Sequence, residues 1–164
     1  MPKPTKYATI ICLVLSAIAL IGMILGFVYH HALIVVSALL PIVVYEIYRT
    51  EGKSTKLFSW AMLFVLVAEL VLLIWNVNYN LANFLGQDSI YVGHMYVQLG
   101  DIKTIGPVLL AAISVILLIR TYGIYTKWLS IVIIVGSFAT VYILNPILFS
   151  ELTKSAIRQM LGYL

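Results

Sequence analysis

One carboxylate within a long apolar run is the side chain best placed to do chemistry. Residues 57–78 read LFSWAMLFVLVAELVLLIWNVN, and Glu69 is the only charged residue among them. In a helix that begins at Leu57, Glu69 would lie about 18 Å along the axis, near the middle of a bilayer. A carboxylate at that depth costs about 2.5–3.5 kcal/mol to insert, and desolvation favours its neutral form. Such residues commonly bind protons or ions.

Polar side chains elsewhere in the apolar runs are candidates to meet this carboxyl. Asn76 lies two helical turns after Glu69 and would extend a polar seam toward one membrane surface. Ser37 and Thr140 fall at similar depths in two other apolar runs, and we expect them to hydrogen-bond a neutral Glu69. This intramembrane polar site would suit proton or ion transfer. The same hydrogen bonds would equally serve to fix the packing of neighbouring helices.

The histidines are weaker candidates for chemistry. A haem or metal held by His31 and His94 would require both residues to come together from separate elements, and no ligand spacing in the sequence fixes such a site. No cofactor or metal is therefore predicted. The lone Cys12 excludes an internal disulfide, and none of the common hydrolase, zinc-protease or phosphate-loop motifs occurs. These features lean against an enzyme.

Composition places all of these residues in a membrane. The chain is 63% hydrophobic and 10% charged, with a mean hydropathy of +1.08, far from the values of water-soluble domains. Its 164 residues predict a single polytopic membrane domain, 1–164, without a separate soluble domain. The net charge of +4 is spread over the segments between apolar runs. That distribution suits contact with anionic lipid in the bilayer and gives no sign of nucleic-acid binding.

The apolar runs predict an all-α integral membrane protein with five transmembrane helices. Residues 7–48 are too long for one span and are interrupted by His30 and His31, so the first two helices should form a tight hairpin. The connection 79–104 should hold a short helix near 81–85 and a strand-like piece at 90–99. An amphipathic helix at about 151–162 should lie on the membrane surface or on a partner. The expected spans are about 7–29, 32–48, 57–78, 105–122 and 128–149.

Small residues predict where helices approach closely. Gly22 and Gly26 form a GxxxG spacing in the first span, and Gly136 lies in a small-residue patch of the fifth. We expect all three to be helix-packing positions.

Basic residues predict the orientation, because cytoplasmic segments carry an excess of Lys and Arg. A cytoplasmic N-terminus and an external C-terminus place seven basic residues inside: Lys3, Lys6, Arg49, Lys53, Lys56, Arg120 and Lys127. Only three fall outside: Lys103, Lys154 and Arg158.

Three functions fit these features. The first is a non-catalytic membrane subunit or scaffold of a larger complex, bound to other membrane subunits or to itself. It relies on the small-residue faces and on the lack of a catalytic constellation. The second is a small transporter, channel or proton-conducting protein that uses Glu69. The third and weakest is a haem- or metal-binding redox subunit that uses His31 and His94.

Overall fold

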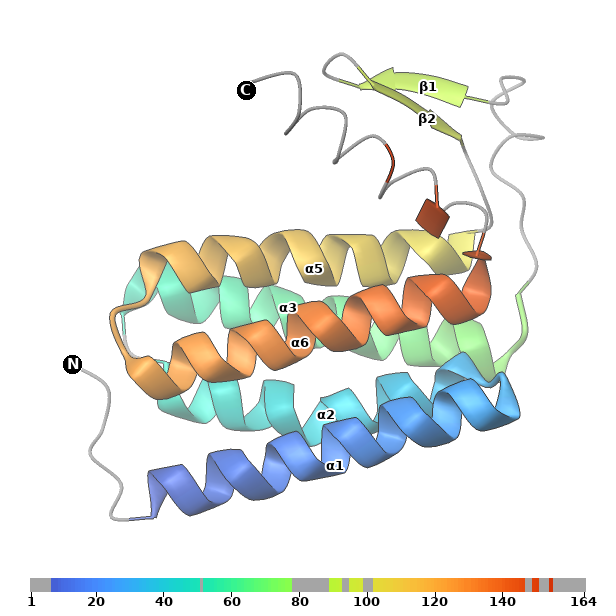
Figure 1. The fold of residues 1–164 in the computed structure, drawn as a ribbon. Helices are drawn as coiled ribbons and strands as arrows, with labels where there is room; N and C mark the ends of the chain where they lie inside the picture. The colour runs from blue at the N-terminus through green and yellow to red at the C-terminus, as the bar shows by residue number, and fades with distance from the viewer. Residues whose placement is uncertain are drawn as a thin grey trace.

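A computed structural model describes most of the chain. The described residues are 7–50, 52–77, 89–92, 95–98, 102–146, 149, 150 and 154. They form a bundle of five helices, each long and apolar enough to cross a membrane (Figure 1). The helices are α1 (Ala8–Tyr29), α2 (Ala32–Arg49), α3 (Lys53–Ile74), α5 (Ile102–Arg120) and α6 (Ile124–Leu144). The all-α fold with five apolar helices is confirmed.

The first two helices form the expected tight hairpin. His30 adopts a left-handed conformation (φ 51°), and the backbone N–H of His31 donates to the Gly26 carbonyl at 3.1 Å, which ends α1. Helix α2 then runs antiparallel to α1, and the two helices pack closely. A Cβ at Gly22 would overlap Ala38, and a Cβ at Gly26 would overlap Val35. Both glycines therefore allow the two backbones to approach closely.

The helices alternate in direction, so the bundle has two distinct ends. Helix α2 packs on α1, α3 and α6, while α5 packs on α3 and α6. The Arg49 end carries the start of α1, the turn between α2 and α3, and the turn between α5 and α6 (Figure 1, left). The Asn76 end carries the turn between α1 and α2, the end of α3 and the start of α5.

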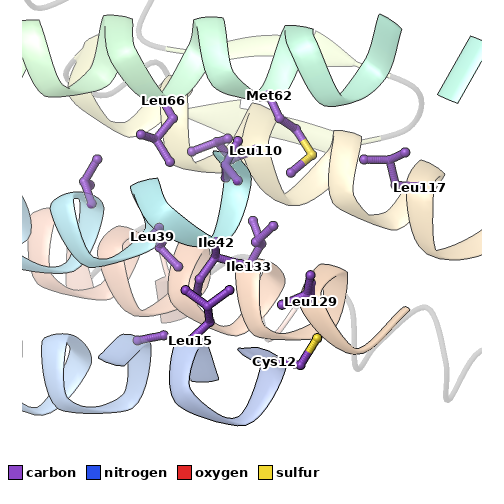
Figure 2. Close-up of a cluster of buried hydrophobic side chains, with 13 residues drawn as sticks. Cys12, Leu15, Leu39, Ile42, Met62, Leu66, Leu110, Leu117, Leu129 and Ile133 are labelled. Carbon is purple, nitrogen blue, oxygen red and sulfur yellow. The ribbon is translucent and has the colours of Figure 1, made fainter. Parts of the chain in front are cut away.

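An apolar core fills the middle of the bundle. Figure 2 shows side chains from all five helices directed toward one another, among them Met62 and Leu66 of α3 and Leu110 of α5. The outward faces are also apolar: Phe64 is 76% exposed and Ile119 is 77% exposed. Large apolar side chains on the outside suit hydrocarbon rather than water. Some polar side chains, among them Glu46, Glu69 and Lys103, are nevertheless buried inside the bundle.

Three helices begin earlier than the sequence predicted. Helix α3 begins at Lys53 instead of residue 57, because Gly52 starts the helix: its carbonyl accepts the Lys56 N–H at 2.9 Å and the Thr55 hydroxyl at 3.2 Å. Helices α5 and α6 begin at Ile102 and Ile124 instead of residues 105 and 128. Polar residues thus form helical turns that continue each span beyond its apolar run.

Smaller elements were predicted less completely. The expected strand at 90–99 is a two-stranded antiparallel hairpin, β1 (Ser89–Val92) and β2 (Met95–Gln98), in which Ser89 pairs with Gln98. The expected helix at 81–85 lies outside the described residues. So does almost all of the expected interfacial helix at 151–162, where only Lys154 is described, in helical geometry.

Candidate functional site

Glu69 lies inside the bundle but closer to one end than the sequence predicted. Its side chain is 1% exposed. Helix α3 ends at Ile74, five residues after Glu69, which is a rise of only about 7.5 Å. The helix ends early because Asn76 adopts a left-handed conformation, with φ of 49°. The carboxyl therefore belongs to the Asn76 end of the bundle and not to its middle.

The Glu69 carboxyl lies against the backbone of α5. A Cβ at Gly106 would overlap the carboxyl oxygen Oε2 and would lie 2.9 Å from Cδ. Both carboxyl oxygens are buried, and neither has a hydrogen-bond partner among the described residues. Buried polar atoms are almost always hydrogen-bonded, and an unsatisfied one costs about 1–3 kcal/mol. Other side chains of the described residues that have such an atom have one each, whereas Glu69 has two.

A buried lysine lies beside this carboxyl. Lys103, one helical turn before Gly106 on α5, is 8% exposed, and its ammonium donates to Asn76 Oδ1 at 2.7 Å. It is close enough to Glu69 to interact with it electrostatically. Lys103 was not among the predicted site residues, because it precedes the apolar run and was expected to lie in the connection before the span. The signal was present, since Lys103, Pro107, Leu110 and Ser114 recur at helical spacing on the buried face of α5.

The hydroxyls predicted to bind Glu69 bond elsewhere. Ser37 is exposed on the outside of α2 and donates to the Ile34 carbonyl at 2.9 Å. Thr140 is buried but donates to the Gly136 carbonyl at 2.8 Å. The two predicted bonds were wrong because Ser and Thr in helices readily bond to a carbonyl of the preceding turn. Of the residues predicted to form this polar site, Asn76 is linked to Glu69 indirectly: it accepts a hydrogen bond from Lys103, which lies beside the Glu69 carboxyl.

A second polar cluster lies at the Arg49 end. Glu46 is 0% exposed and Arg49 is 4% exposed, although charged residues at a helix end usually reach water. The Arg49 guanidinium lies over the Tyr125 ring, 4.6 Å from its centroid. The Thr50 hydroxyl donates to the Glu46 main-chain carbonyl at 2.7 Å and accepts from the Ser59 hydroxyl at 3.3 Å. The cluster thus joins α2, α3 and α6.

The remaining predicted site residues have other surroundings. His31 is exposed in the turn between α1 and α2, while His94 lies outside the described residues. Within the described part of the chain, no three His, Cys, Asp or Glu side chains gather in a way that would hold a metal. Gly136 packs on Leu39, whose Cδ2 would lie 2.7 Å from an added Cβ.

The bundle therefore has a buried charged site near each end. On α3, Ser59 of the Glu46 cluster and Glu69 are ten residues apart, about 15 Å along the helix. Met62 and Leu66, which lie between them, are fully buried in the apolar core. No family model, curated protein or solved structure matches this chain.

Proposed function

We propose that this chain is a proton-conducting membrane protein in which Glu69 binds and releases the proton. The observation that carries the proposal is the buried Glu69 carboxyl, whose oxygens have no hydrogen-bond partner among the described residues. A carboxyl retained only to fix packing would be expected to have such partners. A titratable residue that lies inside a span, faces protein and lacks hydrogen-bond partners is better explained as a group that binds and releases a proton.

Lys103 and Asn76 support this role by their positions. A neutral Glu69 carboxyl suits its apolar surroundings, whereas the carboxylate left after proton release needs a nearby positive charge. The Lys103 ammonium supplies that charge from the adjacent turn of α5. Its partner Asn76 is exposed at the end of the bundle. The released proton would leave past these two side chains toward the Asn76 end.

The scaffold function receives less support. It relied on small-residue faces that would bind other helices, but Gly22 and Gly26 pack on α2, and Gly136 packs on Leu39 of the same chain. Those faces are therefore occupied within the bundle. Association with other membrane subunits or with a second copy has no separate observation in its favour.

The described basic residues favour one orientation. Arg49, Lys53, Lys56, Arg120 and Lys127 lie at or near the Arg49 end of the bundle. Lys103 lies at the other end, and Lys154 follows α6, which ends there. Because cytoplasmic segments carry more Lys and Arg, we place the Arg49 end and the N-terminus in the cytoplasm. Five spans then place the C-terminus outside.

Proton flux into liposomes tests the function. The purified protein would be reconstituted around a pH-sensitive dye, and a potassium gradient with valinomycin would drive proton entry. We expect Glu69→Gln to reduce the flux to that of protein-free liposomes while the unfolding midpoint stays near the wild-type value. Thr140→Val is the matched control, since it removes a buried hydroxyl that does not contact Glu69, and it should conduct normally. Wild-type flux in Glu69→Gln, together with loss of stability in Glu69→Leu, would instead assign Glu69 to packing.

A further inference from the structure

We propose that Glu46 is a second proton-binding carboxyl, which exchanges its proton with the Arg49 end of the bundle as Glu69 does with the Asn76 end. This inference deepens the proposed function, on which it relies for the role of Glu69. Its evidence is a separate group of residues at the opposite end of the molecule.

The Glu46 carboxyl is incompletely hydrogen-bonded in the interior. The side chain is fully buried, and Oε2 has no hydrogen-bond partner among the described residues. Oε1 lies 3.4 Å from the Thr50 hydroxyl, which is a long contact. That hydroxyl has one proton, and it donates at 2.7 Å to the Glu46 main-chain carbonyl. A carboxyl held as a permanent anion would be expected to have stronger donors.

Polar groups lead from this carboxyl toward the surface. The Ser59 hydroxyl lies 3.3 Å from the Thr50 hydroxyl and 3.2 Å from the Thr55 carbonyl, and Thr55 is partly exposed at the start of α3. Each hydroxyl can both donate and accept, so neighbouring hydroxyls can pass a proton by rotating. The hydroxyls lead from Glu46 toward the turn between α2 and α3, where water would have to exchange the proton with Ser59, because the Thr55 carbonyl only accepts.

The groups around Glu46 suit a carboxyl that changes charge. Arg49 on the same helix is a permanent cation and would stabilise the carboxylate after release. Helix α1 contributes the buried thiol of Cys12 on its inward face. Helix α6 contributes Tyr125 beneath the Arg49 guanidinium, and α3 contributes the Ser59 hydroxyl. Helix α1 also contributes the Thr9 hydroxyl, which lies 2.7 Å from the Tyr125 hydroxyl.

An apolar layer separates the two carboxyls. Met62, Leu66 and Leu110 are buried between the two ends. The Ser114 hydroxyl lies among them, 3.8 Å from Met62 Sδ and 2.7 Å from the Leu110 carbonyl. A proton crosses packed apolar side chains only along polar groups or water, and the buried Ser114 hydroxyl donates to the Leu110 carbonyl of its own helix instead of joining the two carboxyls. Each carboxyl should therefore exchange with its own side, and passage between them requires a second conformation of the bundle.

Infrared spectroscopy of the full chain in lipid nanodiscs can test the assignment without measuring transport. A protonated carboxylic acid gives a carbonyl band that shifts when its proton is replaced by deuterium. The Glu46 and Glu69 bands would be identified by their loss in Glu46→Gln and Glu69→Gln, and their shift rates would be followed after transfer to heavy water. We expect Thr50→Val combined with Ser59→Ala to slow the Glu46 shift by about tenfold, equivalent to losing one hydrogen bond of stabilisation. The Glu69 shift should not change.

Three outcomes separate the alternatives. No Glu46 band at any pH at which the protein stays folded would overturn the proposal and leave a static ion pair with Arg49. Equal slowing of both bands in the double variant would also overturn it, because the two carboxyls would then share a route. A Glu46 band that behaves as expected, without any Glu69 band, would support this inference while contradicting the role proposed for Glu69.

Discussion

Gly106 of α5 and Glu69 of α3 occupy complementary positions, because the carboxyl of Glu69 fills the space that a Cβ at Gly106 would need. The absence of a side chain at Gly106 thus brings the backbone of α5 against the carboxyl. Pro107, the next residue, is buried at the same turn. The interior position of Glu69 depends on this one glycine as well as on α3 itself.

Gly106→Ala should disturb both stability and conduction. The added methyl group would force the carboxyl or α5 to move, and overpacking of this kind costs about 1–3 kcal/mol. The free energy of unfolding can be measured by titration with SDS in mixed micelles. In a Glu69→Ala background the clash with the carboxyl disappears, leaving only a 3.2 Å approach to the Glu69 Cβ, so Gly106→Ala should cost much less. An equal cost in both backgrounds would contradict the fit between the two residues.

Asn76 should separate the effect of backbone conformation from the effect of its bond to Lys103. Its φ of 49° strains any residue with a Cβ other than Asn or Asp, whereas glycine adopts it freely. Asn76→Ala and Asn76→Gly both remove the 2.7 Å bond to Lys103, so the alanine variant should be less stable than the glycine variant by about 1 kcal/mol. Asn76→Asp keeps an acceptor and should stay near the wild-type stability. Identical stabilities for the alanine and glycine variants would contradict the left-handed turn.

In the α1–α2 hairpin, a second substitution should restore the stability that a first one removes. Gly22→Ala should destabilise the protein by about 1–3 kcal/mol, because the new methyl group would overlap the Cβ of Ala38. Ala38→Gly removes that Cβ, and the double variant Gly22→Ala/Ala38→Gly should recover most of the loss. The same SDS titration would measure all three proteins. Additive losses in the double variant would show that these two positions do not pack on each other.

Apolar length predicted the five helices, and it did so because hydrocarbon thickness sets a minimum for each span. It could not predict where each helix begins, because polar residues such as Lys53 and Lys103 extend helices without adding apolar length. The true ends of α3 and α5 determine which groups surround Glu69. Once α5 begins at Ile102, Lys103 lies in a helical turn facing Glu69, and once α3 ends at Ile74, Glu69 lies near an end of the bundle.

Depth along a helix also failed to predict which side chains hydrogen-bond to Glu69. Ser37 and Thr140 matched the expected depth of Glu69, but depth does not specify which way a side chain points. Ser37 faces outward, and Thr140 bonds within its own helix. The better signal was the periodic burial of small and polar residues on α5, where Lys103, Pro107 and Ser114 share one face with Leu110. Glu46 and Arg49 likewise continue the buried face of α2 after Leu39, Ile42 and Val43. Their burial was not predicted, because charged residues at a helix end usually reach water.

The orientation of the bundle in its membrane can be tested from both of its ends. Basic residues are concentrated at the Arg49 end, so that end should face the cytoplasm. In a Cys12→Ser background, Tyr122→Cys would place a thiol between α5 and α6 at this end, where the native side chain is 98% exposed. His31→Cys would place one in the exposed turn between α1 and α2 at the opposite end. In intact cells, a membrane-impermeant maleimide should label His31→Cys at once and should label Tyr122→Cys only after the membrane is opened. The reverse pattern would invert the orientation, and labelling of both sites in intact cells would contradict a bundle that spans the membrane between them.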